Sequence, residues 1–316
     1  MSQVLNHSDH KSVIGILAIA VAGSFLTSGC ALLTKSEVQE VKAFANATKN
    51  YGTLPGGAIK AYGDISRNDR ELEASARTFK SGKIAEQVRT NLEKSREADQ
   101  AFAAAAERAD KALSVLNTYS DCLSALSSDT YTDDLGQSAS NLGKSLDQAV
   151  GAYNKSFGGN FGTFGAIVAG AIRAGGGIYI RHKQVTYLRD FIAAADAKMI
   201  PALTRDIRNL MQNNVRPNLT ALKTRLDQDF DIAATHGETL PLETIHTINE
   251  WYDDLKKADQ LAAAATTSAN TYRVAHAKLA AAFAKKTDLQ GVSDEIQTLI
   301  AEIKAAQKIK DDLTTK

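Results

Sequence analysis

Few residues of this chain have types and spacings that could perform chemistry. Glu243 and His246 form a Glu-x-x-His pair, which is one of the two half-sites that a di-iron centre in a helical bundle requires. A second half-site is missing from the sequence, because none of His182, His236 and His276 has a glutamate three positions earlier. We therefore interpret Glu243 and His246 as a surface pair and expect no metal ligands.

Residues 140–147, SNLGKSLD, contain the Gly-Lys-Ser ending of a phosphate-binding P-loop. Ser138 stands where that motif requires a glycine, and no apolar strand precedes it. The His-Glu-x-x-His and Gly-x-Ser-x-Gly motifs of metalloproteases and α/β-hydrolases are absent from the sequence. We expect no catalytic residues, no cofactor and no enzymatic activity.

The apolar run at residues 13–26 ends close to Cys30. As a helix it would extend about 21 Å, which is shorter than the roughly 30 Å hydrocarbon core of a bilayer and suits the h-region of a secretory signal. An uncleaved, tilted span remains an alternative, because residues 12–34 carry no charge. A third alternative is that Cys30 is an ordinary buried thiol.

The segment Thr27-Ser28-Gly29-Cys30 resembles the lipobox of bacterial lipoproteins, although Thr27 stands where leucine is usual. The resemblance implies cleavage before Cys30, a diacylglycerol thioether on its sulfur and an acyl chain such as palmitate on the new amino group. In Gram-negative lipoproteins, an alanine such as Ala31 after the cysteine implies sorting to the outer membrane, facing the periplasm. Lipidation would leave Cys122 without an intramolecular disulfide partner, as a buried apolar residue or a free thiol.

Composition and periodicity predict the elements beyond the anchor. The chain has 37 Lys+Arg against 36 Asp+Glu, so no net field favours nucleic acid as a partner. Only 4 prolines and many alanines favour helix. We predict an all-α fold, an elongated antiparallel helical bundle with coiled-coil character, in which residues 84–126 and 242–286 form the longest helices. Shorter helices are expected at 34–50, 58–80 and 289–314, with breaks at 51–57 and near Gly63.

The expected domain organisation is a signal peptide over residues 1–29, a short tether over 30–35 and a bundle domain over 36–316. The GGNFG segment at 158–162 is a candidate hinge at mid-length. A helix from there to Ile200 should break or kink at Pro201, and another break is expected at Pro217.

Small residues recur at every fourth position around the apolar segment 161–180, where a helix would align them in one stripe. They are Gly158, Gly162, Ala166, Gly170 and Ala174. The favoured interpretation is close helix packing inside the bundle. The alternative is a membrane segment like those of helical pore-forming toxins, although the uncharged stretch before Arg173 is too short to span a bilayer as one helix.

Charges are segregated along the second half of the chain. Residues 161–225 hold ten Lys+Arg against three Asp, whereas residues 227–260 hold nine acids against two lysines. We favour complementary pairing of neighbouring helices. The alternative is a basic face toward anionic lipid or polymer, carried by Arg173, Arg181, Lys183, Arg189, Arg205 and Arg208.

These features favour a lipid-anchored, non-enzymatic interaction or scaffold protein of the cell envelope, with membrane lipid and an envelope protein as partners. The alternative function is membrane perturbation by segment 161–180.

Overall fold

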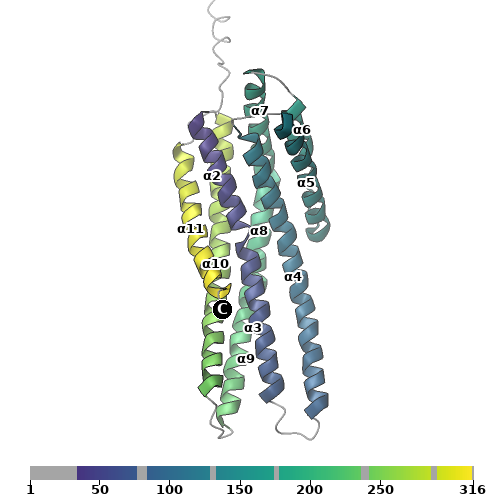
Figure 1. The fold of residues 1–316 in the computed structure, drawn as a ribbon, viewed down its shortest axis with the longest axis vertical. Coiled ribbons are helices and arrows are strands. Elements are labelled where there is room, and N and C mark those ends of the chain that lie inside the picture. The colour runs from purple at the N-terminus through teal and green to yellow at the C-terminus, as the bar shows by residue number, and fades with distance from the viewer. Residues whose placement is uncertain are drawn as a thin grey trace, which may run out of the picture.

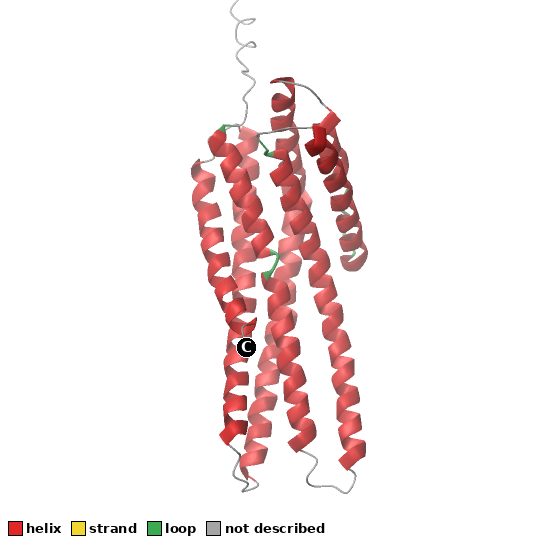
Figure 2. Cartoon of the chain, in the orientation of Figure 1, coloured by secondary structure: helices red, strands yellow, loops and turns green. Residues whose placement is uncertain are grey.

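The computed structural model describes residues 34–76, 84–128, 133–173, 178–235, 242–285 and 290–314. These residues are helical apart from short turns and contain no strand, which confirms the all-α prediction (Figure 2). The elements are α2 (Lys35–Tyr51), α3 (Leu54–Ala76), α4 (Ile84–Leu126), α5 (Asp133–Phe157), α6 (Gly165–Arg173), α7 (Ile178–Ala194), η2 (Ala195–Met199), α8 (Ile200–Leu210), η3 (Met211–Val215), α9 (Arg216–Thr235), α10 (Leu242–Lys285) and α11 (Gln290–Thr314).

The long helices lie side by side along one axis (Figure 1). α10 packs against α11 and α3 and against the segment from α7 to α9, so it connects most of the bundle. α5 and α6 pack on α4 near the end of the bundle where α2 begins, and α11 ends about midway along the long axis. No helix in the described ranges combines the length and the apolar character needed to cross a membrane.

The start of α2 is a capping box at Thr34. The Glu37 backbone N–H donates to Thr34 Oγ1 at 3.2 Å, and the Thr34 N–H donates to Glu37 Oε2 at 2.7 Å, which satisfies two of the donors that a helix start leaves without intrahelical partners.

The predicted break at 51–57 is only the turn Gly52–Thr53, and α3 runs through Gly63 without interruption. The packing of the buried side chains Tyr62 and Ile65 therefore outweighs the low helix propensity of Gly63.

The predicted break at Pro217 is wrong, and at Pro201 the helix also continues without a break. The backbone is helical from Ile178 to Thr235, and each proline follows a π-helical turn. In those turns the Ile200 N–H donates to the Ala195 carbonyl, and the Arg216 N–H donates to the Met211 carbonyl. A proline ring in an α-helix strikes the carbonyl four residues earlier. The extra residue in each π-turn shifts those carbonyls out of that register, so the helix continues.

Candidate functional site

The π-turn η2 places an acidic side chain against the core. Asp196 lies in this turn, and its side chain is 31% exposed. Its carboxylate Oδ1 is 2.9 Å from Nδ1 of His276, which is fully buried on α10. On the other side of the ring, Nε2 of His276 is 2.7 Å from the hydroxyl of Tyr119 on α4. Asp196, His276 and Tyr119, which we call the polar triad, therefore join three segments that are remote in sequence.

The proton positions in the polar triad follow from its chemistry. A carboxylate only accepts hydrogen bonds, so Nδ1 of His276 carries a proton and donates a hydrogen bond to Asp196. Burial lowers the pKa of His276, against the opposing effect of Asp196, and burial raises the pKa of the Tyr119 hydroxyl. The neutral imidazole then accepts a hydrogen bond from the Tyr119 hydroxyl at Nε2, so both ring nitrogens are satisfied.

Aromatic rings pack around Tyr119 and His276 of the polar triad. The Tyr119 ring stacks on Phe191 with centroids 5.0 Å apart, and Phe44 stacks on Tyr272 at 5.1 Å. Phe44 also lies 5.7 Å from the His276 ring. An Asp–His–hydroxyl series resembles a hydrolytic triad in order, but a nucleophile must reach its substrate. The Tyr119 side chain is 0% exposed, so this arrangement fixes the three helices rather than presenting a reactive hydroxyl.

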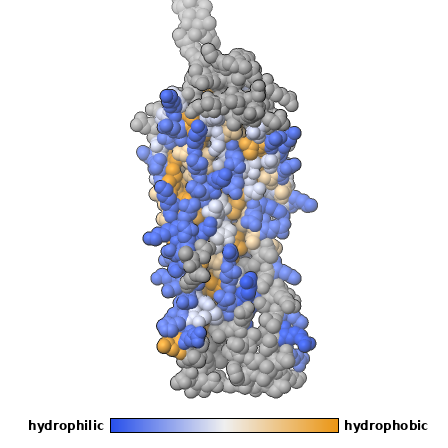
Figure 3. Space-filling model, in the orientation of Figure 1, coloured by the Kyte–Doolittle hydropathy of each residue, from blue (hydrophilic) through white to orange (hydrophobic). Residues whose placement is uncertain are grey.

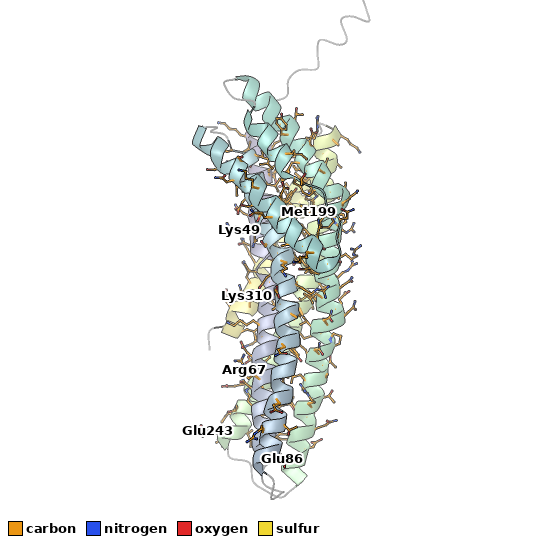
Figure 4. All side chains as sticks on the ribbon, turned by 90° about the vertical axis from the view of Figure 1, so that its right-hand side faces the viewer. Lys49, Arg67, Glu86, Met199, Glu243 and Lys310 are labelled. Carbon is orange, nitrogen blue, oxygen red and sulfur yellow. The ribbon has the colours of Figure 1, made fainter. Side chains whose placement is uncertain are left out.

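A pocket of about 330 Å³ opens at the surface beside the polar triad, between the η2–α8 segment and α10. Figure 4 labels Met199 in this region and shows Glu86 and Glu243 at the opposite end of the bundle. Four cationic side chains and one amide line the pocket together with smaller residues, and none of its lining side chains is acidic. The four cations and the amide are Lys198, Arg205, Arg208, Arg273 and Asn270, which we call the basic pocket.

Two of these cations are held in place by hydrogen bonds. Arg208 Nη1 donates to Asn270 Oδ1 at 3.1 Å across the pocket, and Arg205 Nε donates to Asp206 Oδ1 at 3.1 Å. The other Asp206 oxygen accepts the hydroxyl of Tyr153 on α5. Lys198 and Arg273 have no hydrogen-bond or ion-pair partner among the described residues. Of the four cations in the pocket, only Arg205 therefore has an anionic partner, Asp206, among the described residues.

The structure divides the six residues predicted as a basic face. Arg205 and Arg208 lie together in the basic pocket, whereas Arg189 bonds to its neighbour Asp190 on α7 at 3.2 Å. The side chains of Arg173, Arg181 and Lys183 lie outside the described residues. The complementary pairing also occurs, because Arg216 on α9 forms a two-pronged ion pair with Asp259 on α10, at 2.7 and 3.1 Å.

The small-residue stripe does not follow one helix. Gly158 ends α5 with a left-handed φ of 67°, and Gly162 lies in the following loop, so both precede α6. Ala166 is exposed on α6, and Ala174 lies outside the described residues. Gly170 does meet a neighbour, because a Cβ there would lie 2.8 Å from the Tyr187 ring. A helix crossing with direct backbone contact is formed by a pair that the pattern missed, Gly143 on α5 and Gly165 on α6.

The apolar segment beginning at Phe161 is docked on α5 in this structure. Asp147 Oδ1 accepts the backbone N–H groups of Phe164 and Gly165, at 2.6 and 2.9 Å, and caps the start of α6. Asn154 bonds to both the N–H and the carbonyl of Phe161. The Phe164 side chain is 6% exposed and Val168 is 0% exposed. These contacts hold the first part of the segment against the bundle, with Phe164 and Val168 buried.

The remaining candidates that fall within the described residues do not line the basic pocket. Glu243 and His246 are both exposed in the first turns of α10, and no group of three or more metal-ligating side chains occurs within the described ranges. Cys122 is buried, and burial raises the pKa of its thiol to about 12. Cys30, the predicted lipidation residue, lies outside the described residues.

Sequence reasoning missed the polar triad and three of the five residues of the basic pocket. One signal was available, because His276 falls within the apolar face of α10 between Tyr272 and Leu279. A buried histidine on such a face requires a partner from another helix.

Comparison with known proteins adds no analogy, since no protein-family model, no curated protein and no solved structure matches the chain.

Proposed function

We propose that the protein is a lipid-anchored lipoprotein of the cell envelope, attached through Cys30 to the outer membrane and facing the periplasm, that acts as a non-enzymatic scaffold for an envelope partner. The observation that carries the proposal is the short spacing between the lipobox-like Cys30 and the capped start of α2 at Lys35. With so few residues between them, an acyl anchor would hold the bundle close to the membrane.

The surface supports a binding role. Hydrophilic side chains cover most of the described surface on the face drawn in Figure 3. The packed helices place the basic pocket on a rigid wall, because the polar triad ties η2 to both α4 and α10. Binding sites built on packed helices keep their geometry better than sites on loops.

The test compares two cysteine variants of the full chain in the native host. Cys30→Ala removes the proposed acylation site, and Cys122→Ala is the matched control because Cys122 is the other cysteine of the chain. Membrane fractionation, cross-linking and pull-down should show the wild type and Cys122→Ala in the membrane with the same partner. Cys30→Ala should leave the membrane and lose that partner. A Cys30→Ala protein that keeps both its location and its partner would contradict the proposal.

The competing function is membrane perturbation by segment 161–180. It requires release of the contacts that Asp147 and Asn154 make with Phe161, Phe164 and Gly165. Leakage of dye from anionic liposomes distinguishes the two functions. A scaffold leaves the liposomes intact, and an Asp147→Ala variant that raises leakage well above wild type would favour the competing function.

A further inference from the structure

We propose that the basic pocket is a binding site for the phosphate group of a small phosphorylated ligand. The inference goes beyond the scaffold function and does not depend on acylation of Cys30. It rests on the position, charge and available hydrogen-bond donors of Lys198, Arg205, Arg208 and Arg273 around one pocket of about 330 Å³.

The four cations line one concave site, and none of the lining side chains is acidic. Only Arg205 has an anionic partner among the described residues. Like charges held close together repel one another, and an anion placed among them relieves that repulsion. Exposed cations on separate faces would create no such site, whereas these come from both walls of one pocket.

The arginines of the basic pocket keep free hydrogen-bond donors. Arg205 bonds to Asp206 through Nε, and Arg208 bonds to Asn270 through Nη1. Each guanidinium group therefore keeps terminal N–H donors, while its existing bond restrains its orientation. Arg273 and Lys198 add donors from the opposite wall and from η2. Fixed guanidinium groups bind phosphate oxygens in pairs, and a phosphate offers enough oxygen acceptors to meet donors from both walls at once.

The polar triad links the two walls of the pocket. Lys198 belongs to the same π-turn as Asp196, and Arg273 lies three residues before His276 on α10. The hydrogen bond between Asp196 and His276 therefore links η2 to α10, the two elements that form the walls of the pocket. A site whose walls are fixed before binding loses less conformational freedom when the ligand arrives. The pocket volume, at the lower end of the range for ligand sites, suits a compact polar group.

Phosphate groups reach such a site from two sources, a lipid headgroup or a soluble phosphorylated molecule. The probe is inorganic pyrophosphate, titrated by isothermal calorimetry into the full chain in an uncharged detergent, with sodium chloride matched for ionic strength. The test variant is Lys198→Gln/Arg273→Gln, because neither side chain has a structural partner among the described residues. The matched control is Lys60→Gln/Arg67→Gln, which removes the same two types of charge from exposed positions on α3 (Arg67 is labelled in Figure 4).

We expect saturable binding of one pyrophosphate per chain, at least about 10-fold weaker in the test variant and unchanged in the control. Far-ultraviolet circular dichroism checks that both variants fold. Two results would overturn the proposal: no saturable binding by the wild type, or equal weakening in the test and control variants.

A second titration identifies the source of the phosphate. The same measurement is made in mixed micelles that contain phosphatidylglycerol and, separately, phosphatidylcholine, which carries no net charge. Weaker pyrophosphate binding in the phosphatidylglycerol micelles alone would support the site and assign a lipid headgroup to it. Equal binding in both micelles would support the site and assign a soluble phosphorylated molecule.

Discussion

Replacing Tyr119 by phenylalanine tests the polar triad with the smallest structural change. The substitution deletes one hydroxyl, keeps the ring against Phe191 and leaves Nε2 of His276 without a donor. Water cannot readily replace the donor, because both side chains are 0% exposed. A buried acceptor left without its partner costs about 1–3 kcal/mol of folding free energy. We expect Tyr119→Phe to lower the free energy of unfolding by that amount.

Tyr252→Phe provides the matched control on α10. The Tyr252 hydroxyl donates to Asp227 Oδ1 at 2.5 Å, but the Asp227 side chain is 45% exposed. Water can replace the lost donor there, so the expected loss is below about 1 kcal/mol. Urea unfolding followed by circular dichroism measures both variants at neutral pH. The reasoning is refuted if Tyr119→Phe destabilises the protein no more than Tyr252→Phe does.

Three further predictions concern His276, two glycines and Cys122. Burial lowers the pKa of His276 below its usual 6.5. Below about pH 6.5 the unfolded chain therefore binds a proton before the folded chain does, and the free energy of unfolding falls by up to about 1.4 kcal/mol per pH unit as the pH drops. Urea unfolding at several pH values should show a weaker pH dependence for His276→Gln than for the wild type, and an unchanged pH dependence would exclude this cause. Gly165→Ala should destabilise the folded protein by about 1–3 kcal/mol, because its Cβ would lie 2.8 Å from the Gly143 carbonyl oxygen. A Cβ at Gly151 meets nothing within 4 Å, so Gly151→Ala should stabilise the folded protein by about 0.5–1 kcal/mol. Thermal melts that rank the two variants in the opposite order would contradict this packing. Iodoacetamide should label Cys122 only after unfolding, since burial raises the pKa of its thiol to about 12, and rapid labelling of the native protein would be inconsistent with that burial.

Long helices were the most predictable part of the fold. Apolar spacing placed one helix at residues 84–126 and another at 242–286, and the structure has Ile84–Leu126 and Leu242–Lys285. Such helices repeat their apolar side chains over many turns, so the period is unambiguous. Proline was misleading, because Pro217 was expected to interrupt the chain. A local rule does not foresee that a π-turn before the ring keeps the helix continuous.

The candidate site was much less predictable. Tyr119 and His276 are 157 residues apart, and Asp196 and His276 are 80 apart. Periodicity identifies which face of a helix is buried, but it does not identify which residue of another helix meets that face. Arg205 and Arg208 were found through the charge pattern along the chain, whereas Arg273 lies on a helix whose charge pattern gave no sign of the pocket.

The lipid anchor is the central claim of the proposed function, and the mass of the mature N-terminus tests it most directly. Protein extracted from the membranes of its native host is digested, and the N-terminal peptide is identified by mass spectrometry. The account predicts a peptide that begins at Cys30, with a diacylglycerol group on its sulfur and an acyl chain on its amino group. A peptide that continues upstream of Cys30, or one with an unmodified Cys30, would contradict it.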